Sequence, residues 1–322
     1  MLGRILLALP FLVVGLPAFA QTQLAQQCAA FGEAQYRKLS PSIDRVTALD
    51  FPPPALERME AKAGSQAVNA APYDAVVFEM EHNPYDIQLL RDCMQYMLDR
   101  RQIATSGSIV PAVTPMVRIP ANGGEMNQFL AKQVLDIGVY GVIWPHVSTV
   151  EEARNAVAAC RYPRPPSAPL FEPAGLRGDA PKNAAPYWGL GAQEYYARAD
   201  VWPLDPKGEI LVGIQCEEAR AIRNLPKILE QVPGIGYVLI GEGDLSQDLG
   251  FPRQYEHPTV AAAIDEILAI CKAHNVVCGH PHANAKNVDE LVAKGYRWLM
   301  TLPILSFAGL EKGLKASGRT PG

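Results

Sequence analysis

The fold is decided by residues 210–245, which read ILVGIQCEEARAIRNLPKILEQVPGIGYVLIGEGDL. Two short apolar runs, Ile210–Glu217 and Gly236–Leu245, flank a stretch of helical character. Short apolar runs that alternate with helical periodicity are typical of a parallel α/β fold. Both runs carry an acidic residue near the carboxyl end, so this stretch predicts a candidate site as well as a sheet.

The same alternation continues on both sides of this stretch. Five more strands are expected, at Asp74–Glu81, Thr114–Ile119, Gly141–Val147, Val276–His282 and Arg297–Pro303. Apolar residues recur at helical spacing in Glu125–Ile137 and in Pro258–His274. Seven strands are visible, and an eighth upstream of residue 74 would close a (β/α)8 TIM barrel over residues 71–316.

A proline-rich insertion interrupts the alternation over residues 163–208. A loop of this length inside a compact domain is usually a lid, a binding loop or an insertion. We expect it to follow the fourth or fifth strand, on one of the loops that carry barrel active sites. An interface loop of an oligomer is the equally supported alternative.

The first 20 residues have the features of a secretory signal peptide. Arg4 precedes the apolar run Ile5–Leu16, and Ala18-Phe19-Ala20 provides a cleavage site. We therefore expect an exported protein, periplasmic or secreted, with no stable membrane insertion after cleavage. The alternative is an uncleaved membrane anchor. Residues 21–70 form an N-terminal segment for which the pattern predicts no clear structure.

The composition excludes several classes of protein. Of the 322 residues, 48% are hydrophobic and 19% are charged, which is not the composition of a disordered chain. The net charge of −4 leaves no basic surface for nucleic acid. Six scattered cysteines are too few for a disulfide scaffold.

The carboxyl ends of the expected strands hold a small set of polar groups, at the edge where barrel chemistry is located. The strand bodies consist largely of Val, Ile and Leu. The polar ends are Glu79-Met80-Glu81-His82, Arg118, His146, Gln215-Cys216-Glu217-Glu218, Gly241-Glu242-Gly243-Asp244-Leu245-Ser246 and His280-Pro281-His282. Their coincidence at one edge of one sheet predicts a site.

Two of these carboxylates, Glu217 and Asp244, suit a hard divalent cation. Beside such an ion, Arg118 would bind a small oxo-acid and stabilise developing enolate charge. Each residue also has a simpler structural explanation. Glu217 could favour a helix N-terminus, Asp244 could cap a turn, and Arg118 could belong to a structural ion pair.

His280 and His282 alternate along one expected strand and would point to the same side. A metal site on this pair is an alternative to one on Glu217 and Asp244. No third ligand with a recognised spacing accompanies the two histidines.

About ten short motifs occur in order between residues 74 and 310. They are Glu81-His82, Val117-Arg118, Leu135-Asp136-Ile137-Gly138, Pro145 with Val147 and Glu152-Ala153, Arg161-Tyr162-Pro163, Arg177-Gly178, Gln215 with Glu217, Asn224-Leu225, Ile240-Gly241 with Asp244-Leu245-Ser246, Leu249-Gly250 and His257-Pro258. Together they resemble the HpcH/HpaI aldolase/citrate lyase family, the metal-dependent class II pyruvate aldolases.

The resemblance implies a (β/α)8 barrel whose last helix swaps between subunits of a homo-oligomer, a trimer or hexamer. It implies cleavage of a 4-hydroxy-2-oxo acid to pyruvate and an aldehyde, with Mg²⁺, Mn²⁺ or Co²⁺ as cofactor. Glu217 and Asp244 would bind the metal, and Arg118 would hold the pyruvate oxygens.

The resemblance also implies that His82, paired with Asp136, assists proton transfer. Gly241, Gly243, Ser246 and Arg177 would line the substrate site. Glu79 stands where the family usually has Asp.

Three functions are consistent with these residues. The first is the aldolase. The second uses the same enolate in a decarboxylase or a condensing synthase. The third is an exported protein that binds an oxo-acid without catalysis, which would not need the His82 and Asp136 pair.

Overall fold

The computed structural model of the chain describes residues 74–301, 312–313 and 315–318. These residues all belong to one compact unit, residues 43–322. The predicted signal peptide, the segment 21–70 and an eighth strand upstream of residue 74 lie outside the described residues, as does most of the chain beyond residue 301, where the swapped helix is expected.

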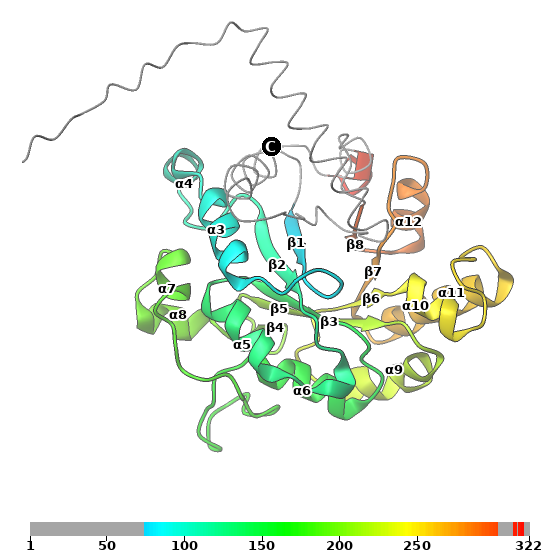
Figure 1. Ribbon diagram of the computed structural model, residues 1–322, viewed down its shortest axis with the longest axis horizontal. Coiled ribbons are helices and arrows are strands. Elements are labelled where there is room, and N and C mark those ends of the chain that lie inside the picture. Colours follow the sequence, from blue (N-terminus) through cyan, green and yellow to red (C-terminus); the bar gives the residue numbers. More distant parts are fainter. Residues whose placement is uncertain (1–73, 302–311, 314, 319–322) are drawn as a thin grey trace, which may run out of the picture. The chain divides into compact units, whose positions relative to one another are not determined.

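Seven parallel strands form the sheet, in the order β1-β2-β3-β5-β6-β7-β8 (Figure 1). Their bounds are Ala75–Glu79 for β1, Thr114–Arg118 for β2, Gly141–Trp144 for β3, Ile210–Cys216 for β5, Tyr237–Ile240 for β6, Val277–His280 for β7 and Trp298–Leu299 for β8. The seven predicted strands are confirmed. Within residues 74–301 the outer strands β1 and β8 do not pair with each other, so the described sheet is open.

An additional strand, β4 at Val201–Trp202, pairs with β5 beside this path. It lies inside the segment predicted as an insertion, not upstream of residue 74 where the eighth strand is expected.

Helices connect successive strands. They are α3 (Ile87–Met97), α4 (Arg100–Ser106), the 3-10 turn η1 (Gly123–Glu125), α5 (Gln128–Asp136), α6 (Val150–Ala159), α7 (Ala184–Tyr187), α8 (Ala192–Arg198), α9 (Ala219–Gln231), α10 (Glu242–Asp248), α11 (Pro258–Ala273) and α12 (Val288–Lys294). The predicted helix at 258–274 is confirmed as α11, which has Pro258 in its first turn. In the described residues, no helix is both long and apolar enough to cross a bilayer.

The helix predicted at residues 125–137 begins later than expected. Met126 has a φ of 52°, a left-handed conformation that a right-handed α-helix cannot include. The chain therefore forms the short turn η1, and α5 starts only at Gln128.

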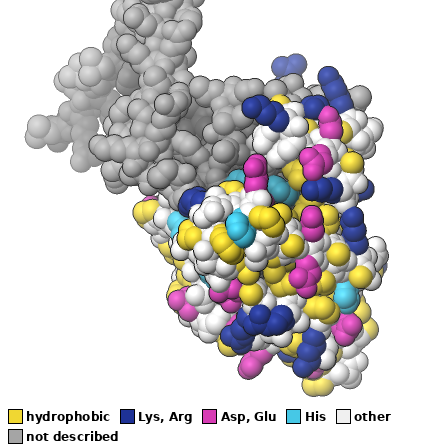
Figure 2. All heavy atoms as spheres, turned by 90° about the vertical axis from the view of Figure 1, so that its right-hand side faces the viewer, with side chains coloured by type: hydrophobic (Ala, Val, Ile, Leu, Met, Phe, Trp, Pro, Cys, Tyr) yellow, Lys and Arg dark blue, Asp and Glu magenta, His cyan; other side chains and the backbone are white. Residues whose placement is uncertain are grey.

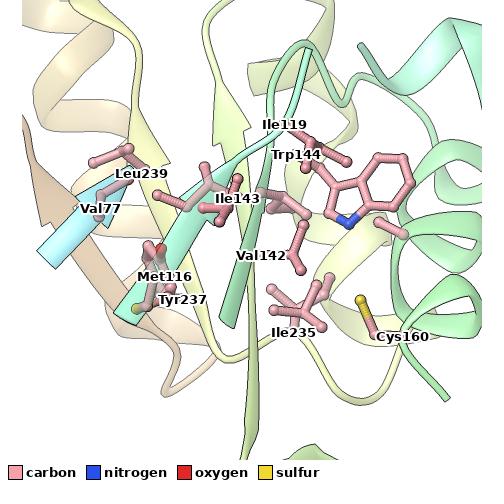
Figure 3. Close-up of a cluster of buried hydrophobic side chains, with 14 of the residues drawn as sticks. Val77, Met116, Ile119, Val142, Ile143, Trp144, Cys160, Ile235, Tyr237 and Leu239 are labelled. Carbon is pink, nitrogen blue, oxygen red and sulfur yellow. The ribbon is translucent and has the colours of Figure 1, made fainter. Parts of the chain in front are cut away.

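The core fixes the strands that carry the polar ends. Val142, Ile143 and Trp144 of β3 are fully buried, and they pack with apolar side chains of β1, β2 and β6 (Figure 3). Because close packing in the core fixes these strands, the polar residues at their carboxyl ends have defined positions.

The proline-rich insertion is anchored by buried charge. Arg161 is 1% exposed, and its Nε donates to Asp200 Oδ1 at 2.6 Å. The same guanidinium donates to the backbone carbonyls of Leu170 and Pro173, each at 2.6 Å. These bonds connect the start of the insertion, just after α6, to its later part, just before β4.

The expectation that this insertion lies on an active-site loop is wrong. It follows helix α6 and precedes strands β4 and β5, so it starts and ends at the amino ends of the strands. Active-site loops of this architecture follow strands instead and lie at the opposite edge.

The side of the molecule that carries α11 has a mixed surface (Figure 2). Lysine and arginine side chains are distributed over this face together with aspartate and glutamate, with hydrophobic side chains between them. The charges on this face therefore form no extended region of one sign.

Candidate active site

Polar side chains gather at the carboxyl ends of neighbouring strands. All seven strands of the main path are parallel, so their carboxyl ends meet at one edge of the sheet. The residues at or just after these ends are Glu79 at the end of β1 and Glu81 after it, Arg118 in β2, His146 after β3, Gln215 and Glu217 at β5, and Asp244 after β6. We call this set the carboxyl-edge cluster.

Arg118 is buried among acceptors. Its Nε donates to Glu79 Oε2 at 2.7 Å, and its NH1 lies 2.8 Å from Glu81 Oε2 and donates to Gln215 Oε1 at 3.1 Å. Burial alone would lower the pKa of Arg118, but the charges of Glu79 and Glu81 raise it. The guanidinium is thus a fixed cation inside an acidic cluster.

Glu217 is 1% exposed and each of its oxygens has a defined donor. The backbone N–H of His146 donates to Oε1 at 2.6 Å, and Gln215 Nε2 donates to Oε2 at 2.7 Å. A Cβ atom at Gly241 would lie 2.0 Å from Glu217 Oε2. The Glu217 carboxylate therefore packs directly against the backbone of Gly241, the residue predicted to line the substrate site.

The cluster holds excess negative charge. Burial raises the pKa of Glu217, and the charges of Glu81 and Asp244 raise it further, against the opposing effect of His146. Burial also raises the pKa of Glu81, although Arg118 lowers it. Asp244 lies in the first turn of α10, close enough to act on both Glu217 and His146. The charge of Asp244 therefore acts on Glu217, but among the described residues Asp244 is not in the group whose ligand atoms lie close enough together to share a metal ion.

The donor set fits a divalent cation. One ligand atom each from Glu81, His146 and Glu217 lies within 4.8 Å of the others, and this group combines carboxylate oxygens with an imidazole nitrogen. Glu81 Oε2 is buried, and the Arg118 guanidinium 2.8 Å away offsets only part of the negative charge of Glu81, Glu217 and Asp244. A divalent ion would offset the remaining mutual repulsion of the carboxylates.

His82, Gly243 and Ser246, which are also predicted site residues of this edge, differ in their exposure and in their hydrogen bonds. His82 has a side chain 49% exposed, with Nε2 3.5 Å from Glu81 Oε2. Gly243 has open space where a side chain would be. The hydroxyl of Ser246 is used internally, because it donates to the Gly243 carbonyl at 2.7 Å and accepts from the Arg253 N–H at 2.9 Å.

The structure does not bring Asp136 and Arg177 to this cluster within the chain. Asp136 ends α5, five residues before β3 begins, which places it at the amino edge of the sheet. Arg177 NH2 lies 3.0 Å from Asp136 Oδ1 and donates to Tyr195 Oη at 2.8 Å. The length of the strands separates this pair from His82 by on the order of 10 Å or more. The predicted pairing of His82 with Asp136 is therefore not formed inside the described chain, and Arg177 is a buried structural cation there.

His280, the last residue of β7, and His282, two residues beyond it, bind one carboxylate. His280 Nε2 lies 3.1 Å from Glu242 Oε1, and His282 Nδ1 contacts Glu242 Oε2. Glu242 thus lies between the two histidines, and among the described residues they are not part of the group that could hold a metal.

Five residues of this edge were not assigned a role from the sequence. Glu79 and Gln215 hold Arg118, Glu81 and His146 contribute possible ligand atoms, and Glu218 contacts His146. The rule that polar residues at strand ends form the site selects all five, but it does not say which of them holds Arg118 and which offers a ligand atom.

Comparison with known proteins agrees with this geometry. Residues 60–300 match the model of the HpcH/HpaI aldolase/citrate lyase family. The chain is 34% identical over 224 residues to a 2-keto-3-deoxy-L-rhamnonate aldolase of Klebsiella pneumoniae, covering 69% of this chain and 72% of that protein. It is 32% identical over 260 residues to a 4-hydroxy-2-oxo-heptane-1,7-dioate aldolase of Salmonella dublin, covering 79% and 82%.

Among solved structures, the fold is similar to that of an HpcH/HpaI aldolase/citrate lyase family protein from Burkholderia cenocepacia. The TM-score is 0.59 at 25% identity, over 83% of this chain and 91% of the other.

Proposed function

The chain belongs to the HpcH/HpaI aldolase/citrate lyase family and is a carbon–carbon lyase, and from this premise we propose that it cleaves a 4-hydroxy-2-oxo acid to pyruvate and an aldehyde. The observation that supports the proposal is the buried Arg118 beside Glu81, Glu217 and His146 at the carboxyl edge. Two relatives are named for the cleavage of 2-oxo acids of this kind, which supports the substrate class.

A divalent cation, Mg²⁺, Mn²⁺ or Co²⁺, is the proposed cofactor, with Glu217 and Asp244 among its ligands. When bound, such an ion acts as a Lewis acid on a carbonyl oxygen. The fixed guanidinium of Arg118 hydrogen-bonds the oxygen on which enolate charge develops. Glu79 and Gln215 hold that guanidinium in place, so its donors keep one orientation.

His82 is the proposed proton-transfer group. Its side chain is half exposed and adjacent to Glu81, so it can exchange protons with solvent while remaining at the cluster. A general acid or base of this kind contributes about 10²–10⁴-fold to rate.

Enolisation of pyruvate tests the proposal without knowledge of the aldehyde. Proton–deuterium exchange of the pyruvate methyl group is followed by NMR in heavy water, with each of the three metals and with a chelator. We expect exchange with at least one metal and none with the chelator.

Absence of exchange with all three metals would contradict the enolate mechanism. Saturable pyruvate binding in the same samples would then indicate a non-catalytic oxo-acid binder. Exchange accompanied by loss of CO₂ from oxaloacetate, or by condensation, would indicate a decarboxylase or a synthase instead of an aldolase.

We also propose the finer organisation that the family resemblance implies. Residues outside the described part would close the sheet into a (β/α)8 barrel, and the C-terminal helix would swap within a trimer or hexamer. Export is proposed from Arg4, the apolar run 5–16 and Ala18-Phe19-Ala20. N-terminal sequencing that finds Gln21 would support export, and retention of Met1 would contradict it.

A further inference from the structure

We propose that His146 is a nitrogen ligand of the divalent cation, oriented by Glu218, and that it gives the site a preference for transition metals over Mg²⁺. This inference rests on the proposed metal dependence and goes beyond it, because it adds an imidazole to a site otherwise made of carboxylates.

The first support is the position of the imidazole. His146 Nε2 lies 3.9 Å from Glu81 Oε1. Two ligands bonded to one ion at about 2.0–2.2 Å can be separated by up to roughly 4.3 Å. The nitrogen and the carboxylate oxygen are therefore at a separation that one ion can bridge, and Glu217 offers a third ligand atom within 4.8 Å of the other two.

The second support is the partner of the other ring nitrogen. His146 Nδ1 lies 3.2 Å from Glu218 Oε1, closer than the 3.6 Å to Glu217 Oε1, and Glu218 Oε2 accepts from the Ser148 hydroxyl at 2.6 Å. A carboxylate that accepts the Nδ1–H fixes the tautomer in which the Nε2 lone pair is available to a metal. Metal-binding histidines almost always have such a partner.

The third support is the backbone. His146 has a φ of 52°, in the left-handed region that non-glycine residues rarely adopt. In this conformation the backbone N–H of His146 donates to Glu217 Oε1 at 2.6 Å. His146 therefore positions the Glu217 carboxylate with its backbone and contributes its imidazole ring to the same cluster. Unfavourable backbone conformations of this kind are concentrated at functional sites.

An imidazole changes which metal the site prefers. Carboxylates and water suit Mg²⁺ and Mn²⁺, whereas imidazole favours later transition metals. We therefore expect Co²⁺ to bind more tightly than Mg²⁺, with most of the difference contributed by His146.

The test compares His146→Asn with wild type. Asn tolerates the left-handed backbone, so the variant removes the imidazole without adding strain. We expect Co²⁺ affinity, measured by calorimetry on the full chain, to fall about 10- to 100-fold, while Mg²⁺ affinity changes less than about threefold. Glu218→Ala, which removes only the orienting carboxylate, should lower Co²⁺ affinity about tenfold.

Pulsed electron paramagnetic resonance of the Mn²⁺-loaded protein identifies the ligand directly. Imidazole nitrogen coupling is expected in wild type and lost in His146→Asn. His274→Gln is the matched control, because His274 also faces a carboxylate, Glu230 at 3.5 Å, but lies at the end of α11 away from the cluster. It should keep the coupling and the affinity.

The outcomes separate this inference from the proposed function. Mn²⁺ that binds to wild type without nitrogen coupling would overturn the role of His146 and leave metal dependence intact. Failure of Mn²⁺, Co²⁺ and Mg²⁺ to bind to wild type at all would overturn both.

Discussion

Arg118 shows how a single residue is prepared for its task before any substrate is present. Its side chain is 4% exposed, and the acceptors around it come from β1 and β5. The planar guanidinium uses these acceptors to fix its orientation. A lysine at this position would keep the charge but would present one ammonium group in place of the rigid fork.

Arg118→Lys should therefore lose activity out of proportion to any loss of charge. We expect metal-dependent deuterium exchange of pyruvate to slow by about 10²–10³-fold, the cost of one oxyanion donor. NMR in heavy water gives the rate. Arg154→Lys is the control, because Arg154 is 46% exposed and its ion pair with Glu172 lies at the surface. Equal rates for Arg118→Lys and wild type would remove Arg118 from the mechanism.

At the scale of the element, Glu242 connects β6 and β7. It begins α10 directly after β6, and it binds both His280, the last residue of β7, and His282 beyond it. His280 Nδ1 also accepts the backbone N–H of His282 at 3.2 Å, so its Nε2 is the nitrogen that donates to Glu242. One carboxylate thus holds the ends of two neighbouring strands together.

Glu242→Gln should destabilise the chain in a pH-dependent way. Burial raises the pKa of Glu242, but the hydrogen bonds from the two histidines lower it to about 2, from an ordinary 4.5. A lowered carboxyl pKa contributes stability above the unfolded value, and this is lost as pH falls through the folded value. At neutral pH the loss should be about 3 kcal/mol.

Urea unfolding of both proteins measures that difference, which should shrink as the pH is lowered from about 4.5 toward 2. Glu290→Gln, at an exposed ion pair with Lys294, provides the baseline. A difference that stays constant with pH would show that the loss comes from packing and not from the charge.

Sequence patterns predicted the strands and helices better than they predicted which side chains contact one another. Parallel strands were recognisable because their interiors are continuous apolar runs, and Glu217 and Arg118 followed from their positions at strand ends. The later start of α5 depends on the left-handed φ of Met126, which no spacing reveals. The partner of Asp136 was missed because it depends on which edge a helix end reaches, a property of topology.

At the scale of the whole molecule, the two edges of the sheet have different roles: one carries the candidate active site and the other anchors the insertion. The carboxyl edge holds the acidic cluster around Arg118, and the amino edge holds Arg161 with Asp200 and the insertion. Arg164 also contacts Asp200, so this carboxylate balances two cations. Changes at the amino edge should therefore affect folding without affecting chemistry.

Asp200→Asn tests that separation. Removing one partner of a buried ion pair leaves an uncompensated charge and costs about 3–5 kcal/mol. We expect urea unfolding to show this loss, while the folded fraction exchanges pyruvate deuterium at the wild-type rate. Glu172→Gln, at an exposed ion pair, should cost less than about 1 kcal/mol. A fall in the exchange rate of folded Asp200→Asn would show that the edges are coupled.

The buried arginine at the start of the insertion also makes this protein easy to label. Arg161 donates to the Leu170 carbonyl, so residues 162–169 form a loop closed at its base, and Pro165, Pro166 and Ser167 at its tip are exposed. Exposed loop tips are where added residues are best tolerated. A fluorescent reporter or an affinity epitope spliced between Pro166 and Ser167 would leave the closing bonds in place and face away from the reaction, so turnover and localisation could be followed in the same molecule.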